Sequence, residues 1–422
     1  MIQAREIDGL DLRRHIRPGD TIWCGQACAE PLGLTQALVR QRQEIGGCNL
    51  FCGLLASQTF QPDHADHITF LSYGALGNGR RLADAGVLDV LPSHYSQLPV
   101  LIDRGTIRAD VVLIQLSAEG PDGTFSLGLC HDYLVTAARR ARVVIAEVND
   151  QVPWTYGSEE LAGIRIDEVV RSSYPPPRAT SAATGETERR IAAGVADYVG
   201  DKATLEVGIG MLGDAILSAL ADRRDLGIHT GLLGDGALDL IERGVVTNGS
   251  KSIDPGVTIA GMAFGTERLS RHAQANPQFK LAGPAYTHGI ATLARIDGFV
   301  AINSAIEVDL TGQVNAEVLD GLYVGAIGGQ VDFIRGARES RGGRSIIALP
   351  STTRNGKRSR IVHRLADGIT TTARADADVF VTEWGSAELR GQPLQERRRR
   401  MIGIAHPAHR EALERQVRGE GS

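Results

Sequence analysis

The chain has 422 residues, more than one ordinary domain holds, and its length predicts two or three domains. A hydrophobic fraction of 42% and a charged fraction of 23% exclude a disordered or fibrous chain. The net charge of −5 offers no clustered basic face, so we expect no nucleic-acid partner. No apolar run approaches the ~20 residues of a membrane span, and the N-terminus has no signal-peptide core. We therefore expect a cytoplasmic protein without a membrane partner.

Five cysteines fall in the first third of the chain: Cys24, Cys28, Cys48, Cys52 and Cys130. The spacings of Cys24/Cys28 and Cys48/Cys52 are compatible with a structural zinc site. However, Cys52 lies in the apolar run 50–55, where a free cysteine behaves as a small hydrophobic residue. This context favours buried thiols, and we expect no metal.

The first half of the chain alternates short apolar strands with helices and glycine-rich turns. Strands are predicted at residues 21–23, 49–55, 111–116 and 143–148. Pro31 opens a predicted helix, because its missing N–H costs nothing in the first helical turn. The proline-rich stretch 174–178 is typical of a linker.

The second half continues this pattern, with strands predicted at residues 258–262, 299–302, 345–349 and 379–382. Short apolar strands that alternate with helices indicate largely parallel sheets. The sequence therefore predicts an α/β protein with two tandem domains, 1–182 and 183–422, and a site between them.

A strand, a glycine turn, a helix and a second strand are predicted near the centre of the chain. The turn carries Gly208, Gly210 and Gly213, which fit the G-x-G-x-x-G pattern of a dinucleotide site. Such a site also needs an acidic residue at the end of the second strand, and Gly231 stands there. This disfavours NAD or NADP, whereas a phosphate at the helix N-terminus remains attractive.

A second glycine loop runs from Gly325 through Gly328 and Gly329 to Gln330. Backbone N–H groups in such a loop can stabilise a developing oxyanion. The alternative is a tight turn that needs glycine for positive φ.

Several longer stretches, in order along nearly the whole chain, resemble the acetyl-CoA hydrolase/4-hydroxybutyrate CoA-transferase family. They are CGQACAEPLGL (24–34), VLIQLSAEGPDGTFSLG (112–128), EVNDQVPWTYG (147–157), DLGIHTGLLGDGALDLIERGVVTNGSK (225–251), EVDLTGQVNAE (307–317), GAIGGQVDFIRGA (325–337), SIIALPSTTRNGKRSRIV (345–362), VTEWGSAELRG (381–391) and IGIAHPAHR (402–410). The resemblance implies two tandem NagB/RpiA/CoA-transferase-like domains with the active site in the cleft between them. It implies acyl-CoA and a small carboxylic acid as substrates, no metal, and a homo-oligomer, either dimer or tetramer.

The resemblance also suggests site residues. The thioester carbonyl is expected near the second glycine loop, with Gly328 and Gly329 acting on it. Gly325 and Gln330 of that loop are expected to contact CoA, as are the glycines of the central turn, Gly208, Gly210 and Gly213.

Gly231 departs from the family pattern. Transferases of the family have His-Thr-Glu where this chain has His229-Thr230-Gly231, and that glutamate is their nucleophile. Its carboxylate attacks the thioester, and an enzyme–CoA thioester then passes CoA to a second acid. This is covalent catalysis, and glycine has no side chain for it.

Three hypotheses reconcile the resemblance with the missing nucleophile. A carboxylate elsewhere takes its place, with Glu206 on the adjacent strand as the leading choice and Asp235 and Glu30 as weaker ones. Alternatively, water or another acceptor enters the vacated space, for hydrolysis or direct acyl transfer. The third hypothesis is a divergent acyl-CoA-binding protein without turnover.

Two further residues have a structural alternative to a catalytic role. His229 is a possible general base for the hydrolytic route, but a single histidine on a buried strand is more often packed and hydrogen-bonded. For Glu383, before Trp384 and Gly385, the structural role is favoured.

Overall fold

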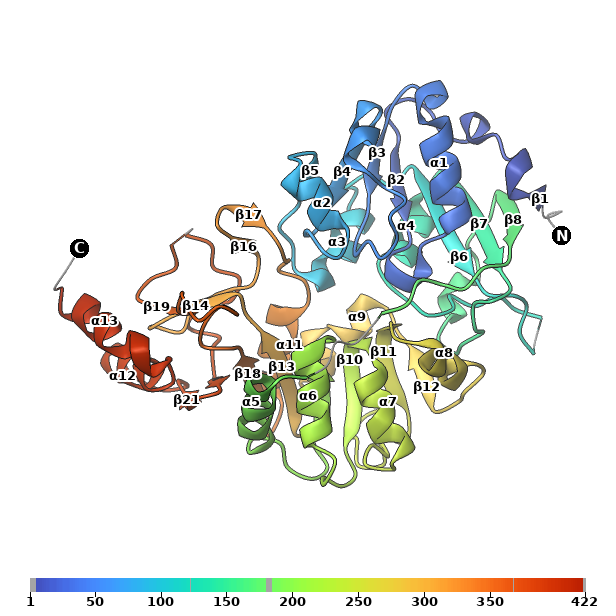
Figure 1. The fold of residues 1–422 in the computed structure, drawn as a ribbon. Helices are drawn as coiled ribbons and strands as arrows, with labels where there is room; N and C mark the ends of the chain where they lie inside the picture. The colour runs from blue at the N-terminus through green and yellow to red at the C-terminus, as the bar shows by residue number, and fades with distance from the viewer. Residues whose placement is uncertain (1–4, 122, 180–183, 367, 420–422) are drawn as a thin grey trace. The chain divides into compact units, whose positions relative to one another are not determined.

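The computed structural model describes residues 5–121, 123–179, 184–366 and 368–419. It has two compact units, each formed by more than one stretch of chain. The first unit comprises Met1–Thr180, Ile259–Thr287 and Leu322–Gly328, and the second comprises Ser181–Thr258, His288–Gly321 and Gly329–Ser422. Each unit contains a large sheet with helices, so the predicted α/β class is confirmed (Figure 1).

The first large sheet has eight strands in the order β1-β8-β7-β6-β2-β3-β4-β5, and every neighbouring pair is parallel. Its strands are β1 (Arg5–Glu6), β2 (Thr21–Cys24), β3 (Cys48–Phe51), β4 (Ile68–Ser72), β5 (Leu88–Val90), β6 (Val111–Leu116), β7 (Val143–Asn149) and β8 (Glu168–Ser172). The continuous apolar runs in the central strands follow from burial on both faces.

Alternation along these strands fills two separate cores. Ile22 and Leu50 point to one core, which α1 covers, whereas Trp23 and Phe51 point to the other, beneath α3 and α4. Trp23 stacks on Phe51 with ring centroids 3.9 Å apart. The helices are α1 (Leu32–Ile45), α2 (Gly79–Asp84), α3 (Leu98–Asp103) and α4 (Leu134–Arg140).

The five cysteines are all free and buried. Cys24, Cys48 and Cys52 belong to the apolar core under α1, where the Cys24 and Cys52 thiols donate to backbone carbonyls. Burial raises the pKa of the Cys52 thiol to about 12. Within the described residues, no group of three or more His, Cys, Asp or Glu side chains could hold a metal ion.

The second large sheet has the order β12-β11-β10-β9-β13-β18-β20-β21. Strands β10, β9, β13, β18 and β20 run parallel, and β21 is antiparallel to β20. The strands are β9 (Thr204–Val207), β10 (Gly227–Leu233), β11 (Thr258–Ala263), β12 (Phe279–Leu281), β13 (Phe299–Ser304), β18 (Arg344–Ala348), β20 (Val379–Thr382) and β21 (Gly385–Glu388).

Helices cover both faces of the β10–β9–β13 region. On one face α5, α6 and α7 lie side by side (Figure 1), and Leu217 of α6 and Ala237 of α7 line a small pocket together with Leu205 and Ile228. On the other face Phe333 of α11 packs against Phe299 of β13, with centroids 6.4 Å apart. The remaining helices are α5 (Glu186–Ala196), α6 (Met211–Ala219), α7 (Asp235–Glu242), α8 (Glu267–Ala273), α9 (Pro284–Thr287), α10 (Ile290–Leu293), α11 (Gln330–Glu339), α12 (Leu394–Gly403) and α13 (Pro407–Arg418).

Two small sheets complete the described strands, in the orders β15-β14-β19 and β16-β17. Their bounds are β14 (Glu307–Asp309), β15 (Val314–Asn315), β16 (Val318–Leu319), β17 (Leu322–Tyr323) and β19 (Ile361–Val362). Among the described residues, none of the helices has the length and apolarity needed to cross a membrane.

The central glycine turn joins β9 to α6, and two of its glycines have a clear structural reason. Gly210 caps α6 at φ 110°, a region that side chains rarely adopt. A Cβ on Gly213 would lie 2.0 Å from the carbonyl oxygen of Gly208. The first turn of α6 therefore packs directly on the backbone that follows β9.

Gly213→Ala should lower the free energy of unfolding by about 1–3 kcal/mol, because the new methyl group forces backbone away from backbone. The measurement is the midpoint of urea unfolding at unchanged m value. Gly403→Ala in α12 is the matched control, since a Cβ there meets no atom of a neighbouring segment within 4 Å. Equal midpoints for the two variants would contradict this packing.

Candidate functional site

A row of polar residues lies on one face of the second sheet, near the carboxyl ends of three parallel strands. Gly227 pairs with Thr204 and Ala301 with Glu206, so the same register sets His229 beside Glu206. Because side chains alternate along a strand, Glu206, His229, Gly231 and Asn303 share this face. Ligands of parallel α/β sheets bind at this edge.

Glu206 of β9 is the buried carboxyl group of this row. Its side chain is 5% exposed, and Asn303 Nδ2 of β13 donates to its Oε2 at 2.9 Å. Burial raises the pKa of Glu206 to about 8, and the Asn303 hydrogen bond opposes the rise. At neutral pH the carboxyl group is therefore mostly protonated, and it ionises in mildly basic solution.

The space next to Gly231 is filled by the imidazole of His288. A Cβ on Gly231 would lie 2.8 Å from His288 Nε2, 2.9 Å from its Cε1 and 3.3 Å from Phe333 Cζ. His288 follows α9, is 4% exposed, and packs on the Phe333 ring with centroids 4.4 Å apart. Any side chain at position 231 would thus displace this ring.

Gly329 borders the same imidazole from a second side. A Cβ there would lie 2.5 Å from His288 Cδ2, 2.6 Å from Nε2 and 2.9 Å from Phe333 Cε2. Glycine at 329 is therefore required for the close approach of the two rings. The predicted residues Gly231 and Gly329 meet at His288, which the sequence did not single out.

Burial lowers the pKa of His288 to about 3, and the neighbouring His229 contributes to the fall. The imidazole is therefore neutral at physiological pH. His229 is itself fully buried, edge-on to Phe299 with centroids 6.5 Å apart, which fits the packed role considered for it.

The other predicted glycines have different surroundings. A Cβ on Gly208 or Gly210 would meet open space, so ligand atoms can approach the backbone there. In the second loop, the Gly325 carbonyl accepts from Ala75 N at 3.0 Å and the Gly328 carbonyl accepts from Tyr95 N at 2.9 Å. The role of the loop's N–H groups toward a thioester carbonyl stays a prediction.

Gln330 is held by the protein at both ends of its amide. Its Nε2 donates to the Ser304 carbonyl at 2.9 Å, and its Oε1 accepts from Thr372 Oγ1 at 3.3 Å. The side chain is also buried. Its role in CoA binding stays a prediction.

The remaining carboxylates considered from the sequence lie elsewhere. Glu383 accepts from the backbone and hydroxyl of Ser351 at 2.9 and 2.6 Å, as expected of a structural residue. Glu30 belongs to the first unit, where Thr35 and Ser57 donate to it. Asp235 is the first residue of α7.

Three residues of the site escaped sequence reasoning: His288, Asn303 and Phe333. Asn303 had a usable signal, since it is a polar residue near the end of an otherwise apolar strand. His288 had none, because it lies between two short helices and outside any motif.

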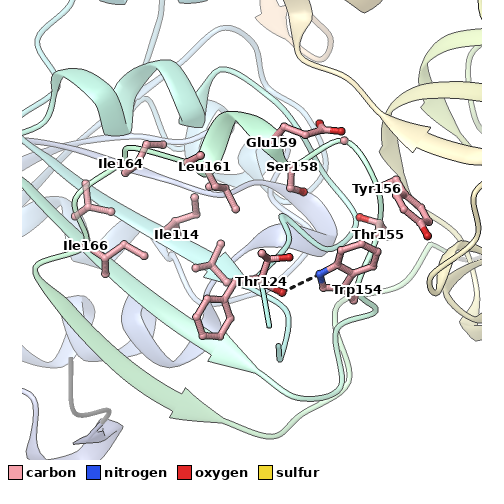
Figure 2. Close-up of a pocket in the computed structure, with 15 residues that line it drawn as sticks. Ile114, Thr124, Trp154, Thr155, Tyr156, Ser158, Glu159, Leu161, Ile164 and Ile166 are labelled. Atoms are coloured by element: carbon pink, nitrogen blue, oxygen red, sulfur yellow. Dashed lines mark hydrogen bonds between the residues drawn. The ribbon is translucent and has the colours of Figure 1, made fainter. Parts of the chain in front are cut away.

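An apolar cavity of about 510 Å³ lies in the first unit and is separate from this row. Figure 2 shows Ile114, Leu161, Ile164 and Ile166 around it, with Trp154 Nε1 donating to the Thr124 carbonyl at 2.9 Å. No residue predicted from the sequence as part of the site lines it. We therefore place the candidate site at the strand ends and not in this cavity.

Comparison with known proteins gives concordant matches. Residues 5–175 match the acetyl-CoA hydrolase/transferase N-terminal domain, and residues 265–417 match the acetyl-CoA hydrolase/transferase C-terminal domain. The 4-hydroxybutyrate coenzyme A transferase of Clostridium kluyveri is 36% identical over 394 residues, covering 92% of this chain and 91% of that protein. The succinyl-CoA:cyclohexane-1-carboxylate CoA transferase of Geobacter metallireducens is 33% identical over 400 residues, covering 94% of this chain and 91% of that protein. The solved structure of RipA from Yersinia pestis is similar, with a TM-score of 0.89 and 32% sequence identity. The match covers 97% of this chain and 95% of the RipA chain.

The raised pKa of Glu206 predicts a pH-dependent stability. The pKa of Glu206 is 4.5 in the unfolded chain and about 8 in the folded protein. Below pH 4.5 the carboxyl group is protonated in both states, so ionisation of Glu206 takes nothing from the free energy of unfolding there. As pH rises from 4.5 to 8, the wild type should lose up to about 1.4 kcal/mol per pH unit relative to Glu206→Gln.

Urea unfolding at several pH values measures this difference. Glu411→Gln serves as the control, because Glu411 is exposed on α13 and its surroundings change little on folding. A wild-type and Glu206→Gln pair whose stability difference stays constant from pH 4.5 to 8 would show that Glu206 is not held in its neutral form.

Proposed function

Because the chain belongs to the acetyl-CoA hydrolase/transferase family, we propose that it transfers CoA to a small carboxylic acid through Glu206. The family places the chain among enzymes of acyl-CoA thioester chemistry, with CoA entering as part of the substrate. The predicted CoA-transferase-like fold is likewise confirmed by its likeness to solved structures. Transfer rather than hydrolysis, and the group that attacks the thioester, are the parts that we propose.

The position of Glu206 is the observation that supports this assignment. It shares a sheet face with Gly231 and lies on the strand next to it, as expected for a relocated carboxylate. Asn303 is hydrogen-bonded to one carboxylate oxygen and limits the rotamers of the side chain. Backbone glycines beyond β9 leave open space in which a thioester can approach.

The chemistry follows from covalent catalysis by a carboxylate. A Glu206 oxygen would bond to the thioester carbon as the C–S bond breaks, giving a mixed anhydride and CoA thiolate. The thiolate would then attack the glutamyl carbonyl and release the first acid as its carboxylate. A second carboxylate would repeat these steps in reverse. Burial makes the ionised nucleophile reactive, because few water molecules solvate it.

Hydrolysis is the second candidate function, and Gly231 is the observation that favours it. No carboxylate can act from that position, and hydrolysis needs none, because the water molecule itself attacks the thioester. A protein that binds acyl-CoA without turnover is the outcome if neither reaction occurs.

Transfer through Glu206 should leave a trappable adduct. After incubation with acyl-CoA, borohydride reduction and mass spectrometry should mark Glu206, because hydride reduces an enzyme–CoA thioester. Glu206→Gln should give no adduct and should lose at least about 100-fold in transfer to acetate. Transfer by the wild type without any label on Glu206 would contradict the proposal.

The pH profile of transfer provides a separate prediction. Only ionised Glu206 is a nucleophile, so kcat should rise about tenfold per pH unit up to pH 8 and then level off. Steady-state rates between pH 6 and 9.5 measure this rise, with Glu411→Gln expected to follow the wild type. A profile that is flat from pH 6 to 8 would exclude Glu206 as the attacking group.

A further inference from the structure

The apolar cavity of the first unit has the size of a ligand site. Its volume is about 510 Å³. Protein interiors leave few voids larger than a water molecule, whereas ligand pockets usually measure ~300–1,000 Å³. An engineered apolar cavity of ~150 Å³ already binds benzene. A packing defect would not reach the volume of this cavity.

Hydrocarbon side chains line most of the cavity. Ile114 and Leu116 of β6 line it from the sheet, and Ile164 and Ile166 line it from the segment before β8 (Figure 2). Phe125, a further lining residue, is 36% exposed, so the lining reaches the surface and a ligand can enter. Contact with such a lining favours a ligand that is itself mostly hydrocarbon.

Two aromatic residues form a fixed part of the lining. Trp154 Nε1 donates to the Thr124 carbonyl at 2.9 Å, and a Cβ on Gly120 would overlap the indole ring. The Tyr156 ring lies edge-on to Trp154, with centroids 5.0 Å apart. These contacts hold the indole in place without a ligand, as is usual for a preformed binding site.

Several polar groups of the lining already have partners within the protein. Thr155 Oγ1 donates to the Gly128 carbonyl at 2.6 Å, and Ser158 Oγ accepts from Leu127 N at 2.9 Å. The Thr124 carbonyl is engaged by the indole. A ligand therefore gains chiefly by burying apolar surface and not by forming hydrogen bonds.

The charges at the cavity disfavour an anionic ligand. Among the described residues that line it there is no Lys, Arg or His, and the one carboxylate is Glu159. Glu159 is paired with Lys280 at 3.2 Å, and its side chain is 70% exposed. A carboxylate or phosphate group bound against the apolar lining would thus lack a lining cation, and an unpaired buried charge is costly. This argues against CoA and free carboxylic acids as occupants.

We propose that the cavity is a second binding site of this protein and that its ligand is a neutral molecule, mostly hydrocarbon. None of the strand-end residues, such as Glu206 and Gly231, takes part in it. The inference therefore stands independently of the proposed CoA transfer, and it adds a class of ligand that the transfer reaction does not use.

Two ligands with the same chain length test the neutral character of the site. Calorimetric titration of the wild type should show that 1-octanol binds with a Kd at least about tenfold lower than that of octanoate, because only octanoate carries a charge into the cavity. Equal affinities would overturn the assignment to a neutral ligand. A wild type that binds no octanol would overturn the site.

Trp154 reports whether octanol enters this cavity. Its fluorescence should change as octanol binds, and Trp154→Phe should lose this change while calorimetry still detects binding. The other two tryptophans, Trp23 and Trp384, do not line the cavity. A fluorescence change that persists in Trp154→Phe would place the octanol elsewhere and contradict the proposal.

Filling the cavity should remove the site. Ile164→Trp and, independently, Ile166→Trp should each weaken octanol binding at least about tenfold, because the larger side chain occupies the ligand's volume. Leu394→Trp is the matched control, since Leu394 is 44% exposed on α12 of the second unit. Wild-type affinity in a folded Ile164→Trp or Ile166→Trp variant would overturn the proposal.

Sedimentation of the same proteins distinguishes a small ligand from a second copy of the chain. The wild type and Ile164→Glu should have the same oligomeric state, because the cavity is expected to hold a small molecule. If the wild type binds no octanol and Ile164→Glu dissociates a wild-type oligomer, the cavity is covered by another copy and the proposal is wrong.

Discussion

The parallel register at the carboxyl ends of β9, β10 and β13 is the constraint on which the candidate site depends. The pairing of Gly227 with Thr204 and of Ala301 with Glu206 puts the acid, His229, Gly231 and Asn303 on one face. Since the side-chain period of a strand is two, a shift of one residue would turn this set toward α6 and α7. The apolar partners of the opposite face hold the register, because they must stay buried.

Burial shifts the pKa values of Glu206 and His288 in opposite directions, and both shifts favour the neutral form. The pKa of Glu206 is about 8 and the pKa of His288 is about 3. Near pH 7 the carboxyl group is therefore mostly protonated and the imidazole is unprotonated, so both groups are neutral. Neutral groups avoid the large desolvation cost of buried ions. A carboxylate nucleophile is charged in its active form, so the burial that keeps Glu206 neutral also keeps most of it inactive near pH 7.

The glycines of the central turn and of the second loop serve different physical needs. Gly213 allows α6 to approach the backbone after β9, and Gly329 allows the His288 and Phe333 rings to approach each other. Gly208 borders open space, and Gly210 has a backbone conformation that favours glycine. The glycines of the central turn alone thus serve three purposes: close packing of α6, the backbone geometry of the turn, and open space for a ligand beside the backbone. This explains why a dinucleotide motif can recur in a protein of CoA chemistry.

The sequence by itself determined the alternation of apolar strands and helices and the family, because these depend on local pattern and on residue identity. That Gly231 takes the place of the family's glutamate stays a prediction. It also indicated Glu206, which lies one strand from Gly231. Only the tertiary structure brought His288 to that glycine, 57 positions along the chain, because the close packing of His288 and Phe333 against Gly231 has no local signal. The same packing set the protonation of Glu206 and His288, since desolvation depends on every segment that excludes water from a side chain.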